Sequence, residues 1–312
     1  MTDNRWYAER NWPRTRAKRE FFWTIVRKLM AWRILRVRNG HYYSPVPSVK
    51  ELKRDSVRVF DRSRRSLPGI ELHEDEQLAL VEQLATFYDE QPFGEAPCDE
   101  LRYFFDNYWF GRADALFLFS FLRLFRPNRI VEIGSGFSSA LMLDTNERFM
   151  DHSMRLTFIE PDSARLQKLL KENDRSSVSI VEQKIQDLDR GVVDQLAAND
   201  ILFVDSSHVL KTDSDVNHIL FELLPRLTTG VLVHFHDVLY PFEYPLKWFE
   251  QGLSWNESHA LRAFLQYNSQ FRILFWNDFM MTFHNEVIRK LMPLCAEPPG
   301  YGVGGSLWLR KA

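Results

Sequence analysis

The sequence contains only two cysteines, Cys98 and Cys295, among its 312 residues. Two cysteines so far apart form neither the framework of a disulfide-stabilised domain nor the spacing of a zinc or redox motif. A long uninterrupted apolar run is also absent, so no segment is expected to span a membrane. The first 20 residues, MTDNRWYAERNWPRTRAKRE, lack the apolar core of a signal peptide, and a cytoplasmic location is expected.

Charge is distributed unevenly along the chain, although the net charge is only −2. Residues 1–70 contain 18 lysines and arginines against 6 aspartates and glutamates, so the other 242 residues carry a net charge of −14. Such a basic segment can bind an anionic membrane surface or a polyanion, or it can pack against the acidic remainder of the same chain or of a neighbouring subunit. A homo-oligomer is therefore one candidate assembly.

Residues 20–38, EFFWTIVRKLMAWRILRVR, favour a helix with large apolar side chains around most of its circumference. Five basic side chains are interspersed along it instead of being gathered on one face, as they would be in an amphipathic membrane helix. Packing against another helix or subunit is one interpretation, with the basic stems lying along apolar surface. Peripheral contact with a membrane through residues 20–38 is the other.

Strand-like and helical patterns alternate along most of the chain. The expected strands cover residues 129–133, 156–159, 178–181, 201–204, 231–235, 271–275 and 306–311. The expected helices cover residues 71–90, 113–125, 138–148, 163–172, 192–198, 214–227 and 257–267. Alternation with short connections predicts right-handed crossovers and a parallel sheet with helices on both faces, which is an α/β fold.

The stretch RIVEIGSGFSSALMLD, residues 129–144, joins the first of these parallel strands to a helix. In an open α/β sheet such a turn lies at the ligand edge, and Gly134 and Gly136 would let a ligand approach the backbone. Ser139 stands where a dinucleotide fingerprint has its third glycine, which weakens the case for a pyrophosphate. Glu132 would repel a pyrophosphate, but it suits a cation such as the sulfonium of S-adenosylmethionine.

Two further acidic residues follow later strands. Glu160 closes the second strand, LTFIE, where a carboxylate can accept hydrogen bonds from both ribose hydroxyls of a nucleoside. Asp187 follows the third strand and is placed to accept from an adenine amino group, with Gln186 equally within reach. These residues suit a nucleoside ligand without separating NAD from S-adenosylmethionine.

The fourth strand ends at Asp205, and His208 follows in the next loop. Transfer of a methyl group to a hydroxyl requires removal of the hydroxyl proton, and a histidine with an ordinary pKa of about 6.5 suits that task. His208 is therefore the expected general base, with Asp205 as a second catalytic residue. Residues 237–248, DVLYPFEYPLKW, either cover the acceptor or serve as aromatic packing.

The fifth strand, VLVHFHD, places His234 and His236 on one face and Asp237 on the other. His234 lies in mid-strand and is expected to be a hydrogen-bonded structural residue. Asp205 and Asp237 end neighbouring parts of the sheet edge, where two carboxylates can bind Mg²⁺, so that ion is a second candidate cofactor. The candidate metal ligands are Asp205, His236 and Asp237. Alternatively, Asp205 orients the amine of the cofactor and Asp237 caps the next loop.

The runs EIGSGFSS, FIEP, ILFVDSSH and LLPRLTTGVLVHFHDV together resemble class I S-adenosylmethionine-dependent methyltransferases, particularly the small-molecule and sugar O-methyltransferases. The resemblance covers residues 105–312, leaving residues 1–104 as a basic, mainly helical arm and cap. It implies a Rossmann-like, doubly wound, seven-stranded sheet, mostly parallel, whose last strand, SLWLRK, is antiparallel. It also implies that the glycine turn holds the methionine part of the cofactor. The candidate cofactor residues are Glu132, Gly134, Ser135, Gly136, Ser138, Glu160, Asp187 and Asp205.

The expected function is therefore O-methylation of a small molecule or saccharide. A non-catalytic binding or assembly module that uses its basic arm is the main alternative. An NAD-dependent oxidoreductase is disfavoured by Ser139 and by the lack of an assignable hydride-transfer site. Nucleic acid is not the expected partner, because the body of the chain is acidic and has no N-P-P-Y-type stretch.

Overall fold

The computed structural model describes residues 37–296 and 304–312, which fall into two compact units. The smaller unit contains the helices Val49–Arg54 (α2), Ser56–Val59 (α3) and Leu246–Glu250 (α10). The larger unit contains residues 60–245 and the described residues from 255 onward, including the whole sheet. The structure thus groups residues 60–104 with the sheet, and a domain boundary after residue 104 stays a prediction.

The expected helix at residues 20–38 lies almost entirely outside the described part of the chain. Among the residues that are described, none of the helices combines the length and the hydropathy required to cross a lipid bilayer.

The sheet has seven strands in the order β3-β2-β1-β4-β5-β7-β6. The strands are Arg129–Ile133 (β1), Arg155–Ile159 (β2), Ser179–Val181 (β3), Ile201–Val204 (β4), Leu232–Phe235 (β5), Phe271–Trp276 (β6) and Leu307–Lys311 (β7). Strands β1 to β5 are parallel to one another, and β7 is antiparallel to both β5 and β6. The predicted fold class, including the antiparallel last strand, is confirmed.

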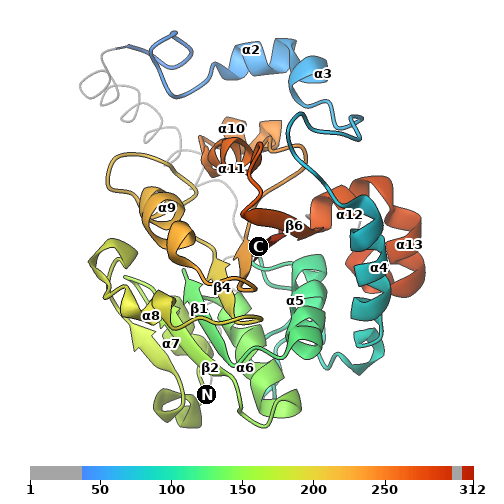
Figure 1. Cartoon of the computed structure of the whole chain (residues 1–312), viewed down its shortest axis with the longest axis vertical. Helices are drawn as coiled ribbons and strands as arrows, with labels where there is room; N and C mark the ends of the chain where they lie inside the picture. The colour runs from blue at the N-terminus through green and yellow to red at the C-terminus, as the bar shows by residue number, and fades with distance from the viewer. Residues whose placement is uncertain (1–36, 297–303) are drawn as a thin grey trace, which may run out of the picture. The chain divides into compact units, whose positions relative to one another are not determined.

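Helices flank this sheet. Those of the larger unit are Glu74–Ala85 (α4), Arg112–Phe125 (α5), Phe137–Phe149 (α6), Ala164–Leu169 (α7), Gly191–Asp194 (α8), Asp215–His218 (α9), Glu257–Leu265 (α11), Asn277–Phe283 (α12) and Asn285–Leu291 (α13). Helices α4, α5, α6 and α7 form a row in which each contacts the next, and α12 and α13 lie beside α4 (Figure 1). Strongly apolar α5 is buried along almost its whole length.

Several expected helices are shorter in the structure. Residues 71–90 form α4 and a 3₁₀ turn, Tyr88–Glu90 (η3), and the helix expected at 192–198 is the short α8. Two further expected helices are interrupted. The one expected at residues 214–227 is an α-helical turn that continues as a π-helix, Ile219–Leu223 (η6), and then as a 3₁₀-helix, Leu224–Arg226 (η7). Pro225 lacks a backbone N–H and therefore cannot continue an α-helix. The helix expected at residues 163–172 ends at Leu169 (α7). Beyond it, the Asp174 carboxylate accepts the N–H of Lys171 at 2.7 Å and begins a separate 3₁₀ turn, Glu172–Ser176 (η4).

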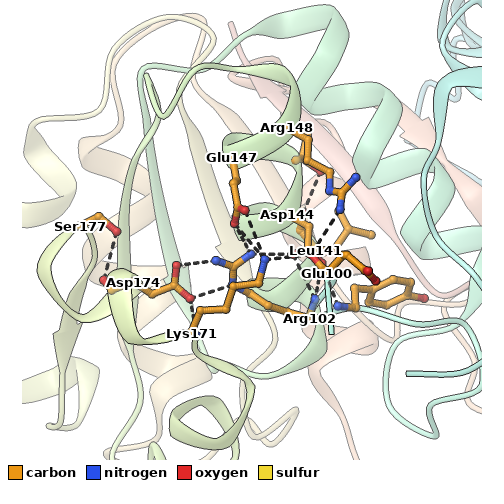
Figure 2. Close-up of polar contacts among 11 residues, drawn as sticks. Glu100, Arg102, Leu141, Asp144, Glu147, Arg148, Lys171, Asp174 and Ser177 are labelled. Carbon is orange, nitrogen blue, oxygen red and sulfur yellow. Dashed lines mark hydrogen bonds and ion pairs between the residues drawn. The ribbon is translucent and has the colours of Figure 1, made fainter. Parts of the chain in front are cut away.

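A buried ion network fastens the segment before α5 to the sheet-flanking helices (Figure 2). The Arg102 guanidinium donates to both carboxylate oxygens of Asp174, at 2.7 and 2.6 Å, and to Asp144 at 2.7 Å. Asp144 also accepts the backbone N–H groups of Arg102 and Tyr103. The side chains of Arg102, Asp144 and Asp174 are all more than 90% buried. The desolvated charge of each is therefore compensated by the opposite charges within the network.

The strand order reverses between β1 and β4, which are hydrogen-bonded neighbours. In doubly wound sheets, ligands bind at the carboxyl ends of the strands beside such a switch point. The turn after β1 and the loop after β4 therefore meet where a ligand site is expected.

Candidate active site

The glycine turn fits tightly against the end of β4. Gly134 has φ +83°, and a β-carbon there would lie 1.8 Å from the carbonyl oxygen of Asp205. Its N–H donates to the carbonyl of Ile159 at the end of β2. Gly136 is extended, and a β-carbon there would lie 3.2 Å from Cδ of Arg165. The backbone ends of three strands are thus held together at Gly134.

Glu132 is completely buried beneath this turn. Its two carboxylate oxygens accept the hydroxyls of Ser138 and Ser139, each at 2.5 Å, and Ser139 Oγ also accepts the N–H of Gly136 at 3.0 Å. Burial raises the pKa of Glu132 to about 8, against the opposing effect of these hydrogen bonds. The serine at the third-glycine position therefore binds the carboxyl group, and Glu132 does not line the pocket described next.

A pocket of about 490 Å³ opens beside the turn. Its lining residues are Ile133, Gly134, Ile159, Glu160, Pro161, Lys184, Ile185, Gln186, Asp205, Ser206, Ser207, Lys211, Asp213, Ser214 and Asp215. The Glu160 carboxylate is fixed at its rim by the N–H groups of Ser135, at 3.2 Å, and Asp162, at 3.0 Å. Gln186 lines the pocket, whereas Asp187 does not.

Beside the pocket, two imidazoles lie between the carboxylates that end β4 and β5. His208 Nε2 lies 3.4 Å from Asp205 Oδ1 and 3.8 Å from Asp237 Oδ2. His236 Nδ1 lies 3.5 Å from the same oxygen of Asp205 and 3.7 Å from the same oxygen of Asp237. The structure therefore brings together four residues that the sequence predicts for catalysis or metal binding.

Each imidazole has a further buried carboxylate on its other nitrogen, and sequence reasoning missed both of these residues. Glu257 Oε2 lies 2.9 Å from His208 Nδ1, and Asp114 Oδ2 lies 3.6 Å from His236 Nε2. Asp114 had a detectable signal, because a charged residue inside a strongly apolar helix needs a partner. Glu257, the first residue of α11, carries no comparable signal.

These contacts change the ionisation of the cluster. Burial alone would lower the pKa of His208, but hydrogen bonds with Asp205 and Glu257 outweigh burial and raise it to about 10. Burial also opposes the charge on His236, whose pKa the carboxylates of Asp237 and Asp205 nevertheless raise well above its ordinary value. Burial would raise the pKa of Asp205, yet the charge of His236 holds it well below its ordinary range. In the absence of a ligand, both imidazoles therefore carry a positive charge near neutral pH.

The backbone of this cluster is held in an uncommon conformation. His208 has φ +57° and Asp237 also has φ +57°. The His208 carbonyl accepts the N–H groups of Asn256 and Glu257, at 3.1 and 3.2 Å, so main chain and side chain both tie this residue to the start of α11. Left-handed residues other than glycine cost free energy and are concentrated at functional sites.

His234 and the segment 237–248, at the same edge of the sheet, can be compared with their predicted roles. His234 is fully buried, stacks on Phe203 at a centroid distance of 3.7 Å and pairs with the Ser306 hydroxyl at 2.8 Å, as a structural residue would. Three of the aromatic residues of 237–248 serve as packing: Tyr240, Phe242 and Tyr244 are at most 1% exposed.

Within residues 37–296 and 304–312, no group of three or more histidine, cysteine, aspartate or glutamate side chains is arranged to hold a metal ion. Asp205, His236 and Asp237 do lie close together. A donor set that includes imidazole nitrogen differs from the oxygen ligands that Mg²⁺ prefers, and metal binding by these three residues stays a prediction.

Comparison with known proteins bears on the same region. Residues 131–238 match the model of a family described as a methyltransferase domain, a range that runs from β1 to just beyond Asp237. An uncharacterized protein of Archaeoglobus fulgidus is 36% identical over 166 residues, which cover 51% of this chain and 73% of that protein.

Solved structures with a similar fold are more distant. The Podospora anserina methyltransferase PaMTH1, bound to S-adenosylhomocysteine, is 14% identical, with 86% of this chain and 99% of that chain covered and a TM-score of 0.41. The O-methyltransferase TomG of Streptomyces achromogenes, in complex with S-adenosylmethionine, is 19% identical, with 71% and 89% covered and a TM-score of 0.37. Similarities this distant say nothing about the substrate or chemistry of this chain.

The family model thus spans the glycine turn and the acidic strand ends, and the sheet has the seven, mostly parallel strands and the antiparallel β7 that the resemblance implied. Residues 131–238 therefore belong to a methyltransferase-domain family, and the sheet that contains them has the fold of the class I S-adenosylmethionine-dependent methyltransferases.

Proposed function

We propose that this methyltransferase transfers a methyl group to a hydroxyl of a small molecule or saccharide, with His208 as general base. The observation that carries the proposal is the position of His208. One ring nitrogen is paired with buried Glu257, and the other faces the strand-end carboxylates beside the pocket. A buried carboxylate that orients an imidazole toward a reacting group is the usual support of a histidine base.

The pocket suits the nucleoside cofactor of this family. The rim carboxylate of Glu160 is positioned to accept ribose hydroxyls, because two backbone N–H groups fix it in place. Ser135 Oγ, in the glycine turn, is buried and has no hydrogen-bond partner among the residues that the structure describes, so a polar ligand group can use it. When bound, the cofactor supplies a methyl group on a positively charged sulfur, a charge that Asp205 would attract.

His208 would act through its Nε2 atom. Glu257 holds Nδ1, which leaves Nε2 directed toward the carboxylates and available to an acceptor hydroxyl. The same carboxylates stabilise the imidazolium that forms when the ring takes the proton. A cationic ligand beside Asp205 opposes that charge and favours the neutral ring that a base requires.

The test is a His208→Ala variant, with His259→Ala as the matched control, because His259 is half exposed and pairs with Glu243 away from the pocket. His208→Ala is expected to reduce methyl transfer from labelled S-adenosylmethionine to hydroxyl acceptors by about 100-fold or more. Its affinity for S-adenosylhomocysteine, measured by calorimetry, should stay close to that of the wild type. An unchanged transfer rate in His208→Ala removes this residue from the chemistry.

Metal assistance through Asp205, His236 and Asp237 remains a separate proposal. In the present arrangement the two imidazoles take the contacts with the carboxylates that a cation would need. Methyl transfer measured in excess EDTA decides the question: activity lost on chelation and restored by Mg²⁺ supports a metal, and full activity removes it.

A further inference from the structure

We propose that residues 104–111, FFDNYWFG, form the acceptor-binding turn of the enzyme. In this proposal the exposed rings of Tyr108 and Trp109 stack on the flat face of an uncharged, ring-shaped acceptor. The inference rests on the proposed O-methyl transfer and specifies which acceptors the site can take. It follows from the position of the turn, its rigidity and its exposed rings.

The turn lies beside both halves of the site. The Phe110 ring packs against the His236 ring at a centroid distance of 5.3 Å. On the other side, the Arg165 guanidinium lies over the Trp109 ring at 4.1 Å, and Cδ of Arg165 is the nearest atom to a β-carbon built on Gly136. The turn therefore reaches from the imidazole cluster to the glycine turn.

The side chain of Asn107 fixes the shape of this turn. Its Oδ1 accepts the N–H groups of Trp109 and Phe110, at 3.0 and 2.7 Å. Its Nδ2 donates to the carbonyls of Phe104 and Phe110, at 2.7 and 3.0 Å. All four hydrogen bonds lie within the turn, so its conformation is set before any ligand binds.

Both ends of the turn are anchored in the core. At the start, Tyr103 donates its N–H to Asp144 within the Arg102 network and its hydroxyl to the carbonyl of Phe110. At the far end, α5 carries Asp114, the partner of His236. A rigid support of this kind reduces the entropy that a binding surface loses when a ligand arrives.

The two rings at the tip of the turn are exposed. Tyr108 is 85% and Trp109 51% exposed, and the rings meet edge to face at 5.4 Å. Most other large aromatic residues near the site are buried, including Phe110 and Tyr103. Tyrosine and tryptophan offer large flat contact surfaces at a low entropy cost, which suits them to ring-shaped ligands.

The charges around the site favour an uncharged acceptor. Four carboxylates, those of Asp114, Asp205, Asp237 and Glu257, surround the two imidazoles and would repel an anion. The Arg165 guanidinium over the Trp109 ring would repel a cation. The acceptor class is therefore a neutral ring that carries a hydroxyl, either a sugar or a phenol.

The experiment measures binding of 4-nitrophenyl β-D-glucopyranoside, which offers both kinds of ring, to the enzyme saturated with S-adenosylhomocysteine. Saturation-transfer-difference NMR gives the affinity for the wild type, for the double variant Tyr108→Ala/Trp109→Ala and for Trp109→Phe. Phe221→Ala is the matched control, because it removes a ring that is 60% exposed on η6, outside the turn and the pocket lining.

The double variant should bind the probe at least about tenfold more weakly than the wild type, and Trp109→Phe should recover part of that loss. Phe221→Ala should match the wild type. Equal affinity in the double variant, or no binding to the wild type, overturns the inference. Affinity for S-adenosylhomocysteine, measured in parallel, should be the same in all variants. If the wild type does not bind S-adenosylhomocysteine, the proposed function itself is overturned.

Discussion

At the residue scale, two hydroxyl groups surround the buried carboxyl group of Glu132. Ser138 and Ser139 both donate to it, and Ser139 also accepts the N–H of Gly136, so one serine links the carboxyl group to the glycine turn. A glycine at position 139 would leave this link unmade. The departure from the dinucleotide pattern therefore has a structural reason.

Glu132 makes the stability of the fold depend on pH. Its folded pKa, about 8, lies above the ordinary value of 4.5, so the folded state binds the proton more tightly than the unfolded state. The stabilisation from this proton is complete below pH 4.5 and is lost as the pH rises toward about 8. Glu132→Gln, which cannot ionise, should gain stability relative to the wild type between pH 5 and pH 8.

Urea unfolding of both proteins at these two pH values measures that change. The free energy of unfolding of Glu132→Gln, minus that of the wild type, should be larger at pH 8 than at pH 5. The same difference at both pH values would show that the raised pKa is wrong.

Glu257 is predicted to position His208. Glu257→Gln keeps an oxygen that can accept from Nδ1–H but loses the charge, whereas Glu257→Ala loses both. We therefore expect a larger fall in kcat for the alanine variant, by about 100-fold, than for the glutamine variant, with little change in KM for S-adenosylmethionine. Equal losses in the two variants, or a loss confined to KM, would contradict a positioning role.

The sequence predicted those site residues that follow strands. The carboxyl ends of parallel strands share one edge of the sheet, so the sequence alone predicts that the residues there lie close together: Asp205, His208, His236 and Asp237. Glu257 comes from a helix far along the chain, and no local pattern indicates which strand end it will meet.

At the scale of secondary-structure elements, the strands were predicted closely because they are short, continuous apolar runs between polar turns. β1 and β4 have the predicted bounds, and β5 begins one residue later than expected. Helix ends were predicted less well, since they depend on side chains from elsewhere. Asp174, for example, is held by Arg102, a residue 72 positions away.

Gly134 is predicted to be indispensable to the junction of β1, β2 and β4. Gly134→Ala places a methyl group 1.8 Å from the Asp205 carbonyl, whereas Gly252→Ala, at a similar φ of +87°, meets nothing within 4 Å. The control should cost about 1 kcal/mol from its backbone conformation alone. Gly134→Ala should cost more than about 4 kcal/mol in the free energy of unfolding. If urea unfolding shows similar losses of free energy for Gly134→Ala and Gly252→Ala, the close approach of Gly134 to the Asp205 carbonyl is contradicted.

The Arg102 network ties the acceptor-binding turn to the helices. Arg102→Met leaves Asp144 and Asp174 without their buried counter-charge, which should cost about 3–5 kcal/mol in the free energy of unfolding. Arg226→Met removes an exposed partner of Asp194 and should leave the urea midpoint nearly unchanged. A small effect of Arg102→Met would mean that the network contributes little to the anchoring of the turn.

At the scale of the whole molecule, the family follows from the motifs and the strand order, but the acceptor does not. The basic segment at residues 1–70 lies largely outside the described residues, so its predicted membrane or subunit contacts stay predictions. The pocket and the imidazole cluster belong to the larger unit, which holds the whole sheet. The proposed chemistry therefore depends on that unit binding its cofactor.

Calorimetric titration of the protein with S-adenosylmethionine is the most direct test. We predict saturable binding to one site, weakened at least about tenfold in Glu160→Ala through loss of charged hydrogen bonds to the ribose. Glu82→Ala, on the exposed face of α4, should bind as the wild type does. Binding of NAD with no binding of S-adenosylmethionine, or no binding of either, would contradict the account and favour the non-catalytic module.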